Sequence, residues 1–488
     1  MKYPDYGWCI DNSGEELYTK ETKRLVGVIP SERQLSFMEM EYYNFIHFGI
    51  NTFYNREWGD GKEDISRFNP EKLDTDQWCR VLKATGSKGI IITAKHHDGF
   101  CLFDTQYTDH CVMNTAFRRD IVRELSQSCR KYGMKMGVYL SPWDRHESTY
   151  GTDKYNDYFV DQLTELCTNY GELFCFWFDG ACGEGPNGKK QVYDWERYYE
   201  TIRKYQPDAV ISISGPDVRW IGNEGGRVRK SEWSVIPEQK DSAEAVAENS
   251  QQNDDETKKM AVKLDDRDED LGSRELLKNY EQLVFKPAEA DVSINMGWFH
   301  TSNVFAYARK GRSAKELMQI YFNSVGGNAS MLLNVPPNKD GLIGKSEIKR
   351  LNDFTRLISE PFRNEITDFT LSILTKEGEY IKAEKALREN SDGYTMKDNE
   401  LAVSVKFAKK EKLSMVNLRE DLKKSQRVEK FQILAETESD AFTCVYEGTV
   451  IGSRKIVKFE KAVETDEILI LPTQVRDNPV LKDLHFYK

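Results

Sequence analysis

Short apolar segments alternate with helical patterns along the chain as far as residue 340. An apolar segment without a polar break predicts a strand that is buried on both faces, as in a parallel sheet covered by helices. The clearest example is 173–178, which ends abruptly at Asp179 and a Gly-Ala pair. Eight strand and helix units over about 300 residues predict an α/β fold of the (β/α)8 TIM-like barrel type. The predicted strands are 44–49, 89–96, 135–140, 173–178, 209–215, one within 217–235, 291–299 and 330–337.

A doubly wound open sheet is the rival architecture, but it calls for a glycine-rich phosphate loop, and neither GxGxxG nor GxxxxGK[ST] occurs in the sequence. After a linking helix near 342–360, residues 364–488 show short alternating segments separated by polar turns. This pattern predicts a small antiparallel β-sandwich. We therefore expect a catalytic barrel domain with an irregular N-terminal leader over 1–345, and the linking helix and sandwich over 346–488.

One segment, 238–270, breaks the alternation, because it holds 12 acidic and five basic residues without an apolar stripe. We interpret it as a long exposed excursion from the barrel.

Composition excludes several classes of function. A net charge of −11 argues against nucleic-acid and anionic-membrane partners, which need clustered Lys and Arg. Nine scattered cysteines without a CxxC pair predict buried free thiols and no zinc site. Residues 1–30 lack the apolar core of a signal peptide, so we expect a cytoplasmic protein, or a secreted one if a signal peptide has been removed. No 18-residue apolar run occurs, so no membrane span is expected.

Polar and aromatic side chains gather at the predicted carboxyl ends of the strands, where barrel enzymes keep their catalytic groups. Asp179 alone could equally cap the next helix, and a single histidine is more often a hydrogen-bonded core residue. Three of the chain's seven histidines in this set, however, favour a functional site. The set consists of His47, Glu57, Trp58, His96, His97, Tyr139, Trp143, Asp144, Trp177, Asp179, Glu224 and Trp298.

Two reaction classes could use these residues. Metal-dependent hydrolysis is disfavoured, because no second ligand lies two residues after His47, and the adjacent His96 and His97 side chains would point apart on a strand. Glycoside hydrolysis requires two carboxylates that flank the scissile bond. Asp179 is the candidate nucleophile, and Glu224, in the glycine-rich loop 222–226, is the candidate acid/base. The histidines and tryptophans would bind one sugar ring, and no metal or cofactor is expected.

Several motifs resemble glycoside hydrolase family 29, the retaining α-L-fucosidases. The matching segments are 44–49, 57–59, 95–100, 177–181, 220–224 and 332–337. The resemblance implies that Asp179 is the nucleophile and Glu224 the acid/base. It also implies a C-terminal β-sandwich and a fucose pocket lined by His47, Glu57, Trp58, His96, His97, Tyr139 and Trp177, with Trp298 nearby.

The Gly-Asn-Glu element at 222–224 points, through the same resemblance, to the subfamily that prefers α-1,3/1,4-linked fucose in Lewis-type glycans. A fucosylated glycan is then the expected partner. Two alternatives remain open: an α-L-fucosidase with a broader or an α-1,2 linkage preference, and a fucose-binding barrel without catalysis. The sequence makes no prediction of the oligomeric state.

Overall fold

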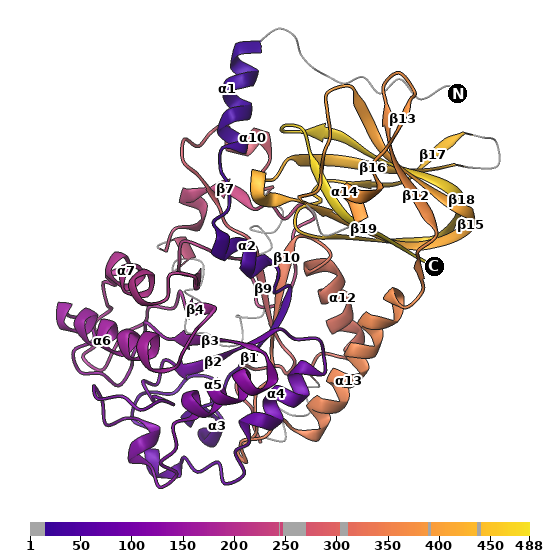
Figure 1. Cartoon of the computed structure of the whole chain (residues 1–488). Helices are drawn as coiled ribbons and strands as arrows, with labels where there is room; N and C mark the ends of the chain where they lie inside the picture. Colours follow the sequence, from indigo (N-terminus) through magenta and orange to yellow (C-terminus); the bar gives the residue numbers. More distant parts are fainter. Residues whose placement is uncertain (1–14, 244, 247–269, 303–310, 389–391, 437–440) are drawn as a thin grey trace.

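The computed structural model describes residues 15–243, 245–246, 270–302, 311–388, 392–436 and 441–488, and the statements below concern these residues. Their first part folds as an eight-stranded parallel sheet in the order β5-β4-β3-β2-β1-β10-β9-β6 (Figure 1). A parallel bridge between Ser212 and Val218 joins the two outer strands, so the sheet is nearly closed. This confirms the predicted (β/α)8 barrel. The barrel strands are β1 (Tyr42–Ile46), β2 (Gly89–Lys95), β3 (Lys135–Leu140), β4 (Cys175–Phe178), β5 (Val210–Ile213), β6 (Arg219–Trp220), β9 (Ala288–Ser293) and β10 (Ala329–Asn334).

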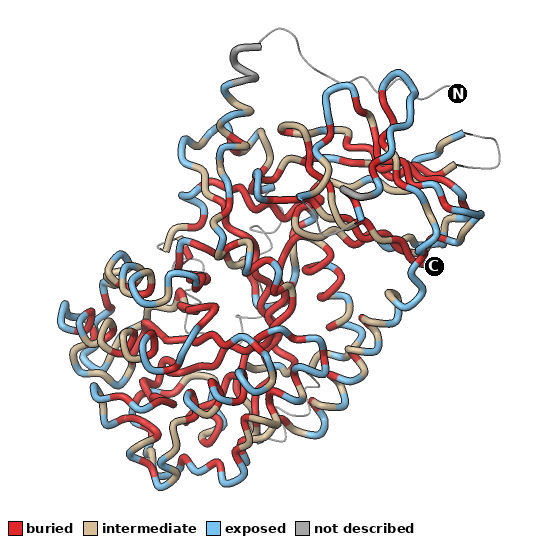
Figure 2. Tube along the Cα trace, in the orientation of Figure 1, coloured by how far each residue is buried: buried red, intermediate tan, exposed pale blue. Residues whose placement is uncertain are grey.

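The barrel strands are buried on both faces, which explains their continuous apolar sequences. Every residue of β2 and of β4 is buried, and Figure 2 shows the strands as the buried centre of this part of the molecule. Helices cover the sheet, and carboxylates cap three of them; the predicted cap Asp74 accepts a hydrogen bond from the Gln77 amide. The barrel helices are α4 (Thr75–Lys83), α5 (Ile121–Tyr132), α6 (Asp153–Asn169), α7 (Trp195–Tyr205), α12 (Ala314–Ser324) and α13 (Lys345–Ser359).

The regular alternation fails between β5 and β9. Only residues 214–218 join β5 to β6, and no helix lies between these strands. The candidate 231–235 contributes instead to β7 (Val235–Pro237), which pairs antiparallel with β8 (Leu283–Phe285) outside the barrel. The last part of the predicted strand 291–299 is a turn, because Ser293 donates from its hydroxyl to the Gly297 carbonyl. Most of the predicted excursion 238–270 lies outside the described residues.

The predicted irregular leader contains a helix. Helix α1 (Glu15–Val26) lies before α2 (Glu32–Met38), and residues 1–14 lie outside the described part of the chain. Arg24 in its last turn donates to the backbone carbonyls of Leu277 and Tyr280, both at 3.0 Å. The helix is therefore held by contacts with a distant segment, which local periodicity does not reveal.

The C-terminal part is an antiparallel sheet of nine strands, in agreement with the predicted β-sandwich. Strands β15 (Glu400–Glu420) and β18 (Lys455–Val475) are long, and register shifts interrupt their pairing. Their inward side chains, Val403 and Ile470 among them, form an apolar core of their own. The other strands are β11 (Glu365–Ile366), β12 (Phe369–Thr375), β13 (Tyr380–Lys382), β14 (Tyr394–Thr395), β16 (Val428–Glu436), β17 (Phe442–Gly448) and β19 (Val480–Tyr487), with helix α14 (Glu384–Arg388) between β13 and β14.

The sandwich contacts the barrel at the end where the parallel strands begin. Glu41, directly before β1, accepts one hydrogen bond from Arg419 at 2.5 Å and another from Arg454 at 2.8 Å. Asn328, directly before β10, accepts a hydrogen bond from the Ser453 amide at 2.7 Å. The opposite end of the barrel, where the strands finish, is thus left for the candidate site.

The cysteines of the described ranges are free. Six of these eight thiols are buried, Cys182 is partly exposed and Cys444 is exposed. Within the same ranges, none of the helices has the length and apolar character that a membrane span requires.

Candidate active site

Asp179 lies directly after β4, at the carboxyl end of the barrel. The Tyr139 hydroxyl donates to its Oδ2 at 3.0 Å, and the Ala181 amide donates to its Oδ1 at 2.8 Å. Helix α7 has its own cap, Asp194, so Asp179 is not a helix cap. The Asp179 side chain keeps 24% of its surface exposed, whereas Tyr139 is buried. The carboxylate is therefore oriented from two sides and remains accessible on another.

His97 faces Asp179 with its Nε2 atom, 3.8 Å from Oδ2. The Ser141 hydroxyl donates its single proton to the Trp143 carbonyl at 2.6 Å, so His97 must donate from Nδ1 to Ser141, over 2.7 Å. Burial lowers the pKa of His97 to about 4, despite the opposing effect of Asp179. The ring is therefore neutral at pH 7 and presents an Nε2 lone pair beside the carboxylate.

His47 has the same protonation pattern. Asn334 donates from Nδ2 to Ser293 Oγ and to the Trp298 carbonyl, which places its Oδ1 atom toward His47. That oxygen accepts from the His47 amide and from Nδ1, at 3.2 and 3.0 Å. Burial lowers the pKa of His47 to about 3. Nε2 of this neutral ring is again a hydrogen-bond acceptor.

Asn334 was not among the predicted site residues. Its signal was an amide at the end of the apolar strand β10, within the segment 332–337 that resembles family 29.

His96 lies between these two histidines. Its ring stacks on Tyr139 at 5.5 Å between centroids and lies 4.1 Å from the ring of His97 and 5.8 Å from that of His47. Burial lowers its pKa well below the ordinary value, with a further contribution from the neighbouring histidines. Three neutral imidazoles thus form one wall beside Asp179.

Trp177 and Glu289 lie deeper in the barrel. The Trp177 indole donates to Glu289 Oε1 at 2.7 Å, the Tyr43 hydroxyl donates to the other oxygen, and the Trp177 ring stacks on Tyr139. Burial raises the pKa of Glu289 to about 7, although both hydrogen bonds oppose the shift. Glu289 was not among the predicted site residues. The sequence signal was the spacing of Glu289 and Asp291, which are two positions apart in β9 and therefore lie on the same, inner face of the strand.

The remaining predicted sugar-binding residues meet the histidines from the loops. Glu57 Oε2 accepts from the Trp298 amide at 2.7 Å, which ties the loop after β1 to the turn after β9. The Trp298 ring lies 5.0 Å from that of His47, and the Trp58 ring lies 5.9 Å from that of His97. The loop after β1 and the turn after β9 thus contact the histidines that form the wall beside Asp179.

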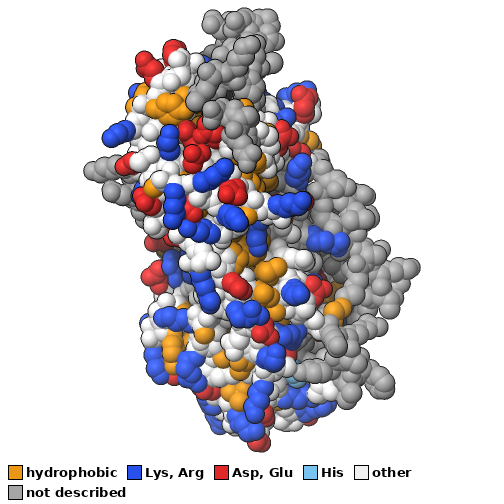
Figure 3. Space-filling view, turned by 90° about the vertical axis from the view of Figure 1, so that its right-hand side faces the viewer, with side chains coloured by type: hydrophobic (Ala, Val, Ile, Leu, Met, Phe, Trp, Pro, Cys, Tyr) orange, Lys and Arg blue, Asp and Glu red, His pale blue; other side chains and the backbone are white. Residues whose placement is uncertain are grey.

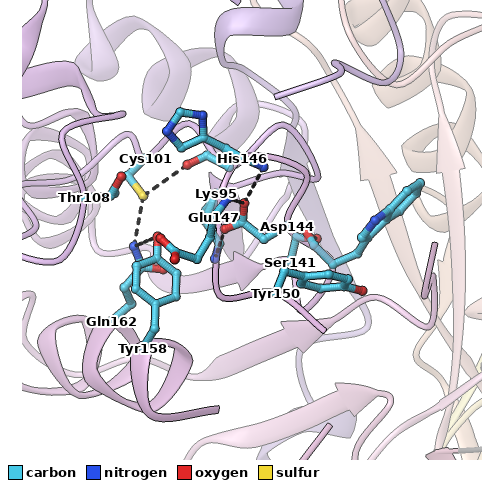
Figure 4. A network of polar contacts seen from close by, with 12 residues as sticks. Lys95, Cys101, Thr108, Ser141, Asp144, His146, Glu147, Tyr150, Tyr158 and Gln162 are labelled. Atoms are coloured by element: carbon cyan, nitrogen blue, oxygen red, sulfur yellow. Dashed lines mark hydrogen bonds and ion pairs between the residues drawn. The ribbon is translucent and has the colours of Figure 1, made fainter. Parts of the chain in front are cut away.

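One predicted rim residue turns inward instead. Asp144, after β3, is fully buried and pairs with the equally buried Lys95 at 2.9 Å (Figure 4). Burial alone would raise the pKa of Asp144, but Lys95 and the amides of His146 and Glu147 hold it below its ordinary value. This ion pair joins the end of β2 to the loop after β3. It therefore supports the segments that carry His97 and Ser141.

Glu224 lies in the loop after β6 and is exposed. Asn223, which is buried, organises this loop, because its Oδ1 accepts from the amides of Gly225 and Arg227 at 3.1 and 3.0 Å. Gly225 forms an antiparallel bridge with Val292, so the loop lies against the carboxyl end of β9. Asp179 and Glu224 therefore follow parallel strands at the same end of the barrel.

A second unpredicted carboxyl lies beside this loop. Asp291 of β9 is buried and accepts from the Trp220 indole at 2.6 Å. Burial, and after it the charge of Glu224, raises the pKa of Asp291 well above its ordinary value. Within the described residues, the site included, no group of three or more His, Cys, Asp or Glu side chains could hold a metal ion.

Comparison with known proteins indicates the family to which the chain belongs. A family model described as alpha-L-fucosidase matches residues 15–360. Alpha-L-fucosidase 1 of Arabidopsis thaliana is 35% identical over 473 residues, which cover 94% of this chain and 87% of that protein. A putative alpha-L-fucosidase structure from Bacteroides ovatus has 40% identity and a TM-score of 0.80, covering 96% of this chain and 76% of that one. A family 29 fucosidase from Ruminococcus gnavus, solved in complex with fucose, has 28% identity and a TM-score of 0.77, covering 94% and 95%.

Proposed function

The chain belongs to the α-L-fucosidase family of glycoside hydrolases, and from this membership we propose a retaining exo-enzyme that removes terminal α-1,3/1,4-linked fucose from Lewis-type glycans. Asp179 is its nucleophile and Glu224 its acid/base. The observation that carries the proposal is the Asp179 carboxylate, oriented by Tyr139 and the Ala181 amide next to three neutral histidines.

The first step uses Asp179 as a nucleophile. In its ionised form it attacks the anomeric carbon of fucose and forms a covalent fucosyl ester. Tyr139 stays protonated, because burial and the adjacent Asp179 raise the pKa of the phenol well above its ordinary value. The phenol can therefore keep its hydrogen bond to Oδ2 and aim one carboxylate oxygen at the sugar.

The second carboxyl completes the cycle. Glu224, protonated at first, gives its proton to the departing glycan oxygen and then removes a proton from the incoming water. Retention requires the two reacting carboxyl groups to stand about 5–5.5 Å apart when the sugar is bound. The placement of both acids at the carboxyl end of the barrel supports this assignment.

Fucose recognition follows from the protonation of the histidines. His47 and His97 each offer an Nε2 lone pair, so each can accept a hydrogen bond from a sugar hydroxyl. His97 Nε2 and Asp179 Oδ2 lie 3.8 Å apart and are both acceptors, so a sugar hydroxyl in front of them donates its single proton to one of the two. Trp58 and Trp298 supply flat apolar surface for the ring and the methyl group of a deoxysugar.

Substitution of Asp179 by Asn tests the nucleophile. With an aryl α-L-fucoside as substrate, we expect turnover to fall by several orders of magnitude while folding stays intact, since catalytic carboxylates contribute on that scale. Asp194→Asn is a matched control at the cap of α7, where Asn also caps well. Near-normal hydrolysis by Asp179→Asn would refute the assignment. Failure of the unaltered protein to hydrolyse the fucoside, with fucose still bound, would favour a non-catalytic fucose-binding barrel.

Substrate choice and product stereochemistry test the rest of the proposal. The unaltered enzyme should hydrolyse Lewis-type trisaccharides faster than 2'-fucosyllactose, and proton NMR should detect α-fucose as the first product. Equal or higher activity toward 2'-fucosyllactose would replace the linkage assignment with the broader or α-1,2 preference. β-Fucose as first product would exclude retention.

A further inference from the structure

A pocket lined by charged and apolar residues begins at the residue after Glu224. One wall is the loop 225–231, and the other is the face of α12 that carries Glu316, Gln319, Ile320 and Asn323. These helix positions are three and four residues apart, so they form one stripe along the helix. The pocket encloses about 760 Å³, which lies in the size range of small-ligand sites.

The pocket wall carries more positive than negative charge. Among the described residues that line it, the cations are Arg227, Arg229, Lys230 and Arg312, and the anions are Asp270 and Glu316. Arg227 and Lys230 are exposed. Arg229 is buried and pairs with Glu232 at 3.6 Å, so the lining keeps an excess of one positive charge, in a chain whose net charge is −11. In Figure 3, Lys and Arg side chains are also spread over the side of the molecule where α12 and α13 lie in Figure 1.

Arg312 links the pocket to the candidate catalytic loop. Its Nη2 donates to the Glu224 carbonyl at 3.3 Å, and its Nη1 donates to the Ser293 carbonyl, at the end of β9, at 2.7 Å. Arg312 also lines the pocket, so one residue contacts the pocket, the Glu224 loop and the strand that carries Asp291. The pocket is therefore continuous with the rim at Glu224.

The position of Glu224 determines which part of a substrate can reach the pocket. An acid that protonates the departing oxygen stands on the side of the leaving group. We propose that the pocket binds an anionic substituent, a carboxylate or a sulfate ester, on the glycan from which fucose is removed. This inference rests on the function proposed above. Guanidinium and ammonium groups are the side chains that recognise such oxyanions through charge-assisted hydrogen bonds.

The test compares three substrates with the same fucosyl linkage: a neutral Lewis-type trisaccharide, its analogue with a sulfate ester on galactose, and its sialylated analogue. We expect kcat/KM for at least one acidic substrate to exceed that for the neutral one by about tenfold, the effect of one charge-assisted hydrogen bond. The ratio should fall as ionic strength rises. A preference for only the sulfated or only the sialylated substrate would identify the source of the anion.

The double variant Arg227→Gln/Lys230→Gln should bring the acidic-to-neutral ratio to about one. The matched control Lys409→Gln/Lys410→Gln removes two exposed charges from the sandwich and should keep the unaltered ratio. Equal rates on all three substrates, or a preference that survives the pocket variant, would overturn the inference. An aryl fucoside reports the fucose site alone, so its lack of hydrolysis would instead refute the proposed function.

Discussion

Histidine chemistry beside Asp179 depends on which nitrogen of each ring carries the proton. Ser141 and Asn334 settle this for His97 and His47, because each accepts from Nδ1 and leaves Nε2 as an acceptor. Burial keeps the rings neutral by lowering their pKa values. In the proposed function, these preset lone pairs accept from a sugar hydroxyl without a protonation step.

The buried histidines predict how stability depends on pH. The pKa of His97 is about 4 in the folded protein, below the ordinary value of 6.5, so the unfolded chain binds more protons between these values. The free energy of unfolding should therefore be highest above pH 6.5 and fall toward pH 4, by up to ~1.4 kcal/mol per pH unit for this histidine. Thermal unfolding of His97→Asn should show a shallower decline over that window. His485→Asn, at an exposed site of β19, is the control, and parallel curves for His97→Asn and the unaltered protein would contradict the argument.

Tyr139 gives a second prediction at this scale. Tyr139→Phe removes the hydroxyl that donates to Asp179 but keeps the ring that stacks on Trp177. We expect kcat/KM for an aryl fucoside to fall by roughly 10- to 100-fold, since hydrogen bonds to charged groups contribute about 1.5–3 kcal/mol. Tyr170 lies shortly before β4, and its hydroxyl donates to Asp120. Tyr170→Phe removes this hydroxyl and should leave activity unchanged. Full activity in Tyr139→Phe would mean that Asp179 needs no such support.

At the scale of elements, the loop after β6 is organised by one side chain. Asn223 binds three backbone groups of residues 225 and 227 and is buried, whereas Glu224 is exposed. The loop is also held by the bridge from Gly225 to Val292 and by the bond from Arg312 to the Glu224 carbonyl, and Asn223 supplies the bonds within the loop. The position of the proposed acid therefore depends in part on its neighbour in sequence.

Asn223→Ala should slow hydrolysis most for substrates whose leaving group must be protonated by the acid. Loss of the loop's hydrogen bonds misplaces Glu224, so hydrolysis of a trisaccharide should fall by about 100-fold, in line with general-acid contributions. An aryl fucoside with a good leaving group should lose much less. Asn114→Ala removes comparable local bonds from an exposed turn and should change neither rate. Equal losses on the two substrates would show that the loop does not act through the acid.

At the scale of the whole molecule, the sandwich supports the end of the barrel that lies opposite the site. Arg419 and Arg454 reach from the sandwich to Glu41, which directly precedes β1. All three side chains are less than one-fifth exposed. Loss of one partner from a buried ion pair is costly, because the remaining charges stay desolvated.

Glu41→Gln should therefore destabilise the protein by about 3 kcal/mol, as expected for a broken buried pair. Calorimetry should detect a lower unfolding temperature. Glu365→Gln breaks an exposed pair with His485 and should cost under about 1 kcal/mol. Unfolding of both variants at the same temperature would show that the contact at Glu41 does not couple the two parts.

Sequence periodicity predicted the barrel because its strands are buried on both faces and therefore read as uninterrupted apolar segments. Periodicity did not predict the elements that are stabilised by tertiary contacts and have no local apolar pattern. Helix α1 is held by carbonyls more than 250 positions away, and β6 has only two residues. Glu289 and Asp291 were missed because a carboxyl inside a strand shows its partners only after folding.

By itself, the sequence determined the alternation of most strands and helices, the apolar strands of the barrel and the candidate functional residues that follow them. Those properties are local, since they depend on side-chain periodicity and on the ends of individual elements. Only the tertiary structure decided which nitrogen of each histidine is protonated, why Asp144 turns inward to Lys95, and where a cationic pocket adjoins Glu224. Each of these depends on burial and on hydrogen bonds between segments that lie far apart in the chain.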